Sequence, residues 1–382
     1  MRQITRFGFL CLIGGVPGFI VAQAITTSAD KSASTFYDPS PHRVQMVTVD
    51  KDVQLEVLDW GGTGRPVVLL AGSGNTAHIY DDFGPKLAQT YHVYGITRRG
   101  FGASSSPASG YSARRQADDV LEVIAALKIN RPVLVGHSFA GQELSSVATR
   151  FPDKIAGAVY LDAAYGYAFY DPLFGSMEFD LPELQDMLEQ LSKSQNDAKL
   201  IDKLLQSDLS RFNRELQRKK QFAELISQVP ADRAGPSATD RASFAALGAW
   251  YAQNMVGGIP PEVELHLSFE SNPDGSVGKL RSHPPVSSQD SKWEKFEKIP
   301  VPVLAIFACP PDYGPAIDRN SALREKLEAF DAAGCQAQAK ALEKGAPSAR
   351  VVLWPRTYHY LFIARRDDVL NEMRSFVDRL PQ

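Results

Sequence analysis

The sequence is poor in cysteine, has almost no excess of either charge and offers no succession of long apolar runs. Three cysteines among 382 residues are too few for a disulfide scaffold, and a chain of this length can bury a large core without one. The 41 Lys and Arg residues nearly balance 44 Asp and Glu residues, so no concentrated basic surface for nucleic acid is indicated. With 44% hydrophobic and 22% charged residues, the composition excludes a disordered chain, a collagen-like fibre and a polytopic membrane protein.

Motifs of metal- and nucleotide-dependent enzymes are also missing from the sequence. It contains neither the HExxH pattern of many zinc enzymes nor the glycine-rich loop that binds phosphates in P-loop proteins. Internal repeats and low-complexity tracts are lacking too. We therefore expect no metal and no cofactor.

The first 24 residues are typical of an export signal. Two arginines form a positive start, an interrupted apolar stretch covers residues 7–21, and Ala22-Gln23-Ala24 matches a small-x-small cleavage site. We predict cleavage after residue 24, a flexible leader over 25–42, and a secreted or periplasmic protein with no stable membrane insertion. A retained anchor and a buried N-terminal helix are the alternatives.

Cleavage would leave two cysteines, Cys309 and Cys335. Because an exported protein meets oxidants, these two can form a disulfide, and we predict that they do. Two buried free thiols are the alternative.

Short apolar segments alternate with helical stretches along two parts of the chain. Alternating residues on both sides of the turn at 50–52 predict a β-hairpin, and the continuous apolar run 67–71 is typical of a strand buried on both faces. Further strands are expected at 92–97, 132–135, 156–161, 301–307 and 351–354, and helices at 113–127, 142–150, 321–344 and the C-terminus. The pattern predicts an α/β fold with a mainly parallel sheet flanked by helices.

The alternation stops between residues 164 and 297. This stretch has a mostly helical pattern, with one expected strand at 265–269 before the turn at 272–275. We predict a helical cap domain over 164–297, inserted into a core formed by 43–163 and 298–382. Four cap residues either line an apolar pocket or pack between the cap helices: Phe244, Trp250, Tyr251 and Met255.

The segment 136–141, Gly-His-Ser-Phe-Ala-Gly, carries the strongest chemical signal. It lies between a predicted buried strand and a predicted helix, and a sharp turn there needs small residues such as Gly136 and Ala140 on either side of a nucleophile. Such a turn lifts the Ser138 hydroxyl out of the sheet and points the helix N-terminus at the reacting centre. A serine hydroxyl is a weak nucleophile, so Ser138 needs a base and the base needs an orienting acid.

Three histidines follow Ser138 in the sequence. His359 comes just after the strand at 351–354, and strand ends are where this fold class collects functional groups, so we choose it as the base. His266 in the predicted cap and His283 in a loop are the rivals.

Two aspartates follow predicted strands and could orient the base. Asp312 comes five residues after the strand at 301–307 and is our choice. Asp162 directly follows the strand at 156–161 and is the alternative, although it could instead hydrogen-bond a nearby loop.

An oxyanion hole needs two backbone N–H groups aimed at the developing charge. We assign these to Phe139, directly after the nucleophile, and to Ser73 in the glycine-rich loop after 67–71, with Gly74 as second choice. His137 is predicted to point away from the site. His78 and His92 are interpreted as structural.

Together these segments resemble the α/β-hydrolase superfamily. Residues 136–141 resemble its nucleophile elbow, 70–74 its oxyanion loop, 98–104 its Arg-Gly-x-Gly-x-Ser segment, and 358–360 match its late catalytic histidine. The resemblance implies an α/β-hydrolase fold with an inserted cap and a serine hydrolase of esterase or lipase type. Relatives that resemble it but use Asp at the elbow, such as haloalkane dehalogenases, are excluded by Ser138. The acid loop departs from the usual Gly-x-x-Asp, with Ala308 and one extra residue.

We therefore predict an exported Ser-His-Asp hydrolase that cleaves a small carboxylic ester with an apolar or aromatic group through an acyl-enzyme. An amidase, peptidase or lactonase on the same triad is a second hypothesis, because the fold does not choose among these reactions. A non-catalytic ligand-binding protein of the same fold is a third. The sequence does not indicate the oligomeric state.

Overall fold

The computed structural model describes residues 38–194, 197–229, 235–254, 260–281 and 294–381. The predicted signal peptide, the leader up to residue 37, His283 and Met255 lie outside these residues.

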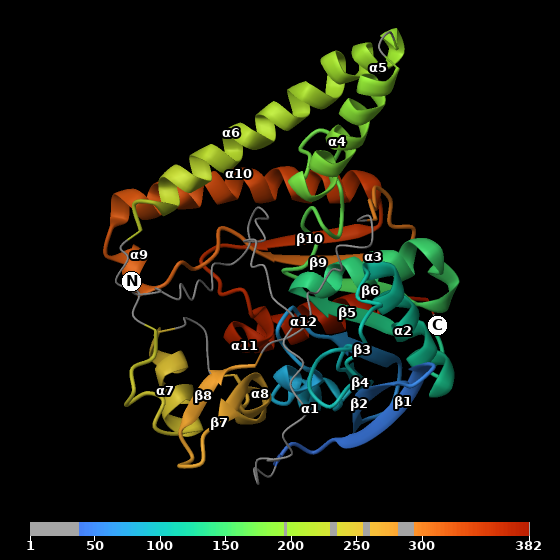
Figure 1. Ribbon diagram of the computed structural model, residues 1–382. Coiled ribbons are helices and arrows are strands. Elements are labelled where there is room, and N and C mark those ends of the chain that lie inside the picture. The colour runs from blue at the N-terminus through green and yellow to red at the C-terminus, as the bar shows by residue number, and fades with distance from the viewer. Residues whose placement is uncertain (1–37, 195–196, 230–234, 255–259, 282–293, 382) are drawn as a thin grey trace.

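An eight-stranded sheet forms the centre of the molecule (Figure 1). Its order is β1-β2-β4-β3-β5-β6-β9-β10, with β2 antiparallel to both of its neighbours and every other pair parallel. The strands are β1 (Arg43–Asp50), β2 (Val53–Gly61), β3 (Pro66–Leu70), β4 (His92–Ile96), β5 (Val133–His137), β6 (Gly157–Leu161), β9 (Val303–Ala308) and β10 (Ala349–Trp354). The predicted hairpin and parallel strands are confirmed.

Apolar side chains cover both faces of this sheet. On one face they come from α2 (Ala113–Ala126), α3 (Gly141–Arg150) and α10 (Ser321–Gly345). On the other face they come from η1 (Ala77–Tyr80), α1 (Gly84–Leu87), α11 (Leu361–Ala364) and α12 (Arg366–Val377). Burial on both sides explains why the central strands are continuous apolar runs.

The chain between β6 and β9 forms two groups of elements at different places on the core (Figure 1). A projecting helical arm comprises α4 (Met177–Lys193), α5 (Ala198–Lys203), the π-helical turn η4 (Leu204–Asp208) and α6 (Leu209–Ile226). The end of α6 packs through Leu225 on α9 (Pro315–Asp318) and α10. A smaller unit comprises α7 (Phe244–Asn254), α8 (Glu262–Ser268), β7 (Phe269–Ser271) and β8 (Val277–Leu280), and its α8 contacts η1.

One expected element of the insertion is wrong. Residues 265–268 belong to helix α8, and the strand begins only at Phe269. Three consecutive residues, Val263 to Leu265, are buried, because this turn of helix contacts η1 on one side and α7 and β7 on the other. Phe244 lies in the buried cluster of this unit and Tyr251 packs against it, as the core-packing alternative predicted.

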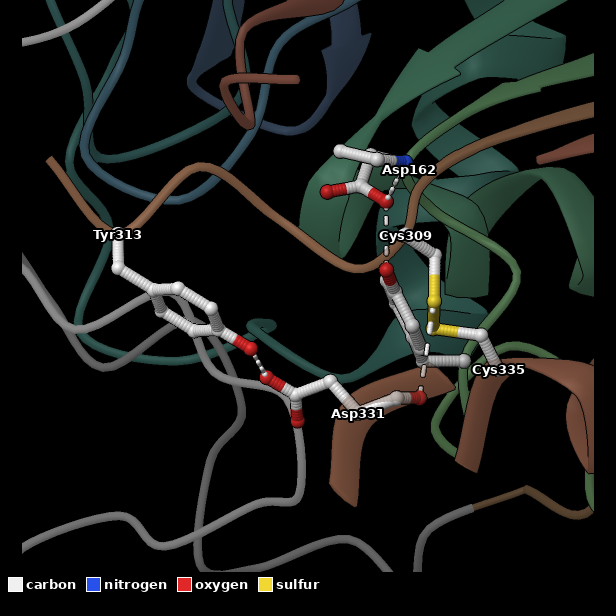
Figure 2. Close-up of a disulfide and its surroundings, with 7 residues drawn as sticks. Asp162, Cys309, Tyr313, Asp331 and Cys335 are labelled. Carbon is white, nitrogen blue, oxygen red and sulfur yellow. Dashed lines mark hydrogen bonds between the residues drawn. A yellow bond between two sulfur atoms is a disulfide. The ribbon is translucent and has the colours of Figure 1, made fainter. Parts of the chain in front are cut away.

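The predicted disulfide is present. Cys309, directly after β9, is bonded to Cys335 on α10, with Cα atoms 6.3 Å apart (Figure 2). The bond therefore ties the end of a central strand to the long helix that covers the sheet. None of the helices in the described ranges is both long and apolar enough to cross a membrane.

Candidate active site

Ser138 occupies a strained turn between a strand and a helix. β5 ends at His137, the turn η2 covers Ser138–Ala140, and α3 follows directly. The backbone φ of Ser138 is +51°, in the left-handed region that non-glycine residues seldom adopt. Small neighbours are needed, because a Cβ on Gly136 would lie 2.6 Å from Leu144 and one on Gly141 would lie 2.0 Å from the Ala163 carbonyl oxygen. The turn leaves the Ser138 side chain partly exposed at the carboxyl edge of the sheet.

A buried aspartate orients His359. The Nδ1 atom of His359 lies 2.6 Å from Oδ2 of Asp162, whose side chain is 3% exposed. The other oxygen, Oδ1, accepts hydrogen bonds from the Ala308 N–H at 2.9 Å and the Tyr165 hydroxyl at 2.5 Å. Figure 2 shows Asp162 beside Cys309, where β6 and β9 end next to each other. Donors therefore hold one carboxylate oxygen in place while the other faces the imidazole.

The preference for Asp312 as the partner of His359 is wrong. Its backbone N–H donates to the Thr357 carbonyl at 3.0 Å, and its Oδ1 accepts the Gly314 N–H at 2.8 Å. Asp312 thus closes its own turn and joins it to the segment before His359. Burial raises the pKa of this carboxyl group, and no described imidazole compensates. The alternative, Asp162, is the aspartate that the fold brings to His359.

His137 packs against His359. Its ring is buried, lies 4.4 Å from the His359 ring, and its Nε2 donates to the His359 carbonyl oxygen at 3.2 Å. Burial, together with the nearby His359, lowers the pKa of His137 well below its usual value. A neutral His137 adds no positive charge beneath His359. We expected His137 to point away from the site; its ring is buried, but it packs directly against the candidate base.

The loop after β3 lies against Ser138. A Cβ built on Gly72 would approach the Ser138 Cβ to 3.0 Å, so only glycine allows this close approach. Arg98 holds the loop from beneath by donating to the carbonyl oxygens of Ala71 at 2.8 Å and Gly72 at 3.0 Å. The same guanidinium pairs with buried Glu143 at 2.6 Å. Arg98 thus fixes the two residues before Ser73, and Ser73 itself is exposed.

A carboxylate from the insertion is hydrogen-bonded to the far end of this loop. Glu264 on α8 accepts hydrogen bonds from the Asn75 side chain at 2.9 Å, the Thr76 N–H at 3.1 Å and the Thr76 hydroxyl at 2.5 Å. Asn75 also accepts from the Tyr360 hydroxyl at 2.8 Å, which connects the loop to the residue after His359. Burial raises the pKa of Glu264 to about 7, against the lowering effect of these donors.

A group of stacked aromatic rings begins at Phe139, the residue directly after Ser138. Phe139 stacks on Tyr167 with centroids 4.8 Å apart, and Tyr165 packs between Tyr167 and Phe307. Phe139 comes from the turn at Ser138, Tyr165 and Tyr167 from the start of the insertion, and Phe307 from β9. They place apolar surface beside the reactive edge of the sheet.

The structure thus brings Ser138, His359, Asp162 and the loop with Ser73 to one edge of the sheet. Asp312 and His266 are not part of this group; His266 stacks on Phe244 with centroids 3.6 Å apart. Sequence reasoning missed the supporting residues Arg98 and Glu264. Arg98 lay within the segment that resembles a family motif, whereas no local pattern marks Glu264.

Comparisons with known proteins agree with this architecture. A profile described as "Alpha/beta hydrolase family" matches residues 67–372. The chain is 27% identical over 101 residues to a 2-(acetamidomethylene)succinate hydrolase of Mesorhizobium japonicum, covering 26% of this chain and 36% of that protein. It is 32% identical over 116 residues to a fluoroacetate dehalogenase of a Burkholderia species, covering 29% and 38%. The match to a bifunctional esterase/perhydrolase of Acinetobacter calcoaceticus is 31% identical over 122 residues and covers 31% and 44%.

The matched segments span less than half of each of these relatives. Among solved structures, an E-2-(acetamidomethylene)succinate hydrolase aligns with 88% of this chain and 99% of its own, with a TM-score of 0.55 and 16% sequence identity. At that identity the likeness supports the fold alone. Because the family profile covers most of the chain and the sheet order agrees with it, the protein belongs to the α/β-hydrolase family.

Proposed function

We propose that the protein is an exported serine hydrolase that cleaves carboxylic esters through Ser138, His359 and Asp162. The observation that carries this proposal is a serine at a left-handed strand-to-helix turn, with a partly exposed histidine held by a buried aspartate at the same sheet edge. The combination supplies a nucleophile, a base and an orienter, which together define the triad arrangement.

In the proposed mechanism, Asp162 accepts the Nδ1–H of His359 and so leaves Nε2 free as a base. Nε2 takes the Ser138 proton as Oγ attacks the acyl carbon, and the imidazolium that forms is stabilised by the buried carboxylate. The N–H groups of Ser73 and Phe139 stabilise the oxyanion. His359 then protonates the leaving alcohol, and water activated by the same imidazole releases the acid from the acyl-enzyme.

Two features support the finer parts of the proposal. The N-terminal signal pattern and the Cys309–Cys335 disulfide are consistent with a secreted or periplasmic protein. The aromatic rings of Phe139, Tyr165 and Tyr167 suit an ester with an apolar or aromatic group.

A fluorophosphonate probe tests the nucleophile. We expect the probe to label the folded protein with one adduct on Ser138, and to leave Ser138→Ala unlabelled. Unlabelled wild-type protein, or equal labelling of Ser138→Ala, would contradict the proposal and favour a ligand-binding role.

A substrate panel then tests the bond class. Nitrophenyl esters of increasing acyl length, amino-acid anilides and acyl lactones are compared by kcat/KM. We expect the esters to be the best substrates. A preference for anilides or lactones would keep the triad and overturn the ester assignment. Fractionation of the expressing cells, with intact-mass analysis of the mature chain, checks export and cleavage after residue 24.

A further inference from the structure

A second group of reactive side chains lies at the start of the described chain, apart from Ser138. Asp38 and His42 precede β1, while His78 lies in η1 and Asp81 directly follows it. Each of the four residues offers one ligand atom, and these atoms all lie within 4.8 Å of one another. We name them the His42–His78 cluster. The mechanism proposed above uses none of them.

The separations inside the cluster fit a small metal ion. Nδ1 of His78 lies 2.9 Å from an Asp81 oxygen and 3.2 Å from an Asp38 oxygen. The ring of His42 spans the same two carboxylates, with Nδ1 3.0 Å from Asp81 and Nε2 3.2 Å from Asp38. Ligand atoms around tetrahedral Zn²⁺ lie about 3.3 Å apart, given bonds of about 2.0–2.1 Å. Small side-chain rotations would therefore make room for an ion.

The chemistry of the four ligands selects among metals. Two imidazoles and two carboxylates suit Zn²⁺ and neighbouring transition metals, whereas Ca²⁺ and Mg²⁺ prefer oxygen ligands alone. The side chains of His42, His78 and Asp81 are 4–7% exposed, and that of Asp38 is 24% exposed. Three of the four side chains are thus almost closed off from water, and Asp38 is the most exposed member of the cluster.

The residues around the cluster hold its members in ligating orientations. Nε2 of His78 faces buried Glu56 at 3.5 Å, which leaves Nδ1 directed at the cluster. Ser40 secures both aspartates, since its N–H donates to Asp38 at 2.9 Å and its hydroxyl donates to Asp81 at 2.8 Å. A carboxylate behind a ligating histidine and hydrogen bonds behind ligating carboxylates are the outer contacts expected of a metal site.

The place of the cluster in the fold suggests what an ion would do there. Residues 38–42 belong to the leader that we predicted to be flexible, yet Asp38 contacts His78 in η1 and His42 contacts Asp81 directly after it. η1 starts directly after Thr76, the last residue of the loop beside Ser138. A bound ion would tie the N-terminal segment to the end of that loop and stabilise both.

We propose that Asp38, His42, His78 and Asp81 form a structural binding site for one divalent transition-metal ion of the Zn²⁺ type. One ring nitrogen from each histidine and one oxygen from each aspartate supply four ligands. The imidazoles bind the ion in their neutral form, through a ring-nitrogen lone pair. The site is independent of the proposed hydrolase activity, because it includes no residue of the triad.

Metal analysis tests the proposal directly. The full chain, purified without a polyhistidine tag, is stripped with EDTA, incubated with ZnCl₂, gel-filtered and measured by mass spectrometry for zinc. We expect about one zinc per chain and a higher Tm than the stripped protein has. Binding of Co²⁺ should give the visible absorption bands of a four-coordinate site.

Matched variants separate this site from adventitious binding. Asp81→Asn and His42→Ala should weaken zinc binding at least roughly 100-fold. His92→Ala removes a more exposed histidine paired with Asp59 at 3.0 Å and should bind zinc like the wild type, as should Ser138→Ala. Asp38→Asn, at the exposed side of the cluster, serves as a gentler variant if the others misfold by circular dichroism. It should also bind zinc more weakly.

Three results would overturn the proposal. Wild-type protein that keeps no zinc after gel filtration would show that the cluster only pairs charges. Equal zinc content in the wild type and in folded Asp38→Asn or Asp81→Asn would place the ion elsewhere. Loss of zinc in His92→Ala or Ser138→Ala, with the cluster intact, would do the same.

Discussion

Replacing Asp162 with asparagine tests which carboxylate orients His359. The substitution changes one oxygen of a buried carboxylate into an NH₂ group and preserves its shape. The structure dictates which way the new amide turns. Oδ1 of Asp162 accepts from two donors, the Ala308 N–H and the Tyr165 hydroxyl, so the amide carbonyl takes that position. The NH₂ group then faces His359 Nδ1, where the carboxylate oxygen stood 2.6 Å away.

The turned amide reverses the role of the imidazole. Nδ1 of His359 must now accept a hydrogen bond, so the neutral ring carries its proton on Nε2, the atom that should accept the Ser138 proton. Loss of the correct tautomer in a serine triad costs about 10⁴ in kcat. Each factor of ten corresponds to about 1.4 kcal/mol, so the barrier should rise by about 5.5 kcal/mol.

The assay compares kcat and KM for a nitrophenyl ester in the wild type, Asp162→Asn and Asp312→Asn. We expect kcat to fall by about 10⁴ in Asp162→Asn with KM changed by less than about threefold, since the acid does not touch substrate. Asp312→Asn should stay within about fivefold of the wild type, because among the described residues the Asp312 carboxylate accepts the Gly314 N–H and pairs with no histidine.

The opposite ranking would refute the reasoning. If Asp312→Asn lost most activity while Asp162→Asn kept it, the observed His359–Asp162 pair would have no catalytic importance. Circular dichroism and Tm must show that both variants are folded, because Asp162 also links β6 to β9 through the Ala308 N–H.

Three further predictions concern the supports of the site. Replacing both Cys309 and Cys335 with serine opens a loop that spans 26 residues and should lower the unfolding free energy by about 3.5 kcal/mol on the chain-entropy relation; denaturant unfolding that shows less than about 1 kcal/mol would contradict it. Because burial raises the pKa of Glu264 from 4.5 to about 7, its proton stabilises the fold fully below pH 4.5 and this contribution is lost as pH rises to about 7. The unfolding free energy of the wild type should therefore fall by about 3 kcal/mol more than that of Glu264→Gln between pH 4.5 and about 7. An equal pH dependence of Tm in the two proteins would refute this role of Glu264. Gly72→Ala should lower kcat/KM about 100-fold, because its Cβ would come within 3.0 Å of the Ser138 Cβ and 2.9 Å of His137 Nδ1 and displace the loop; unchanged kinetics in a folded variant would show that the loop can shift freely.

Patterns of neighbouring residues were sufficient for the sheet and the turn at Ser138. Continuous apolar runs such as 67–71 report burial on both faces, and small residues on each side of Ser138 report crowding at a sharp turn. Both signals are local, because they depend on spacing within a few residues. The helix α8 was misassigned for the same reason, since a run that short satisfies both periodicities.

Contacts between distant segments could not be obtained in this way. Glu264 meets Thr76, which is 188 residues earlier, and Asp38 meets His78 although β1, β2 and β3 lie between them in the sequence. No periodic pattern links such residues, because their proximity arises only after the insertion and the N-terminal segment pack on the core.

The sequence by itself determined the fold class, the position of Ser138 at a strand-to-helix turn and the histidine that could serve it. Only the tertiary structure decided which aspartate reaches that histidine. Asp162 and Asp312 both follow strands of the same sheet, so local patterns treat them as equivalent. The difference is geometric: Asp162 stands directly at the end of β6, where the Ala308 N–H holds one of its oxygens and the other meets His359, while Asp312 lies beyond the end of β9 and closes its own turn.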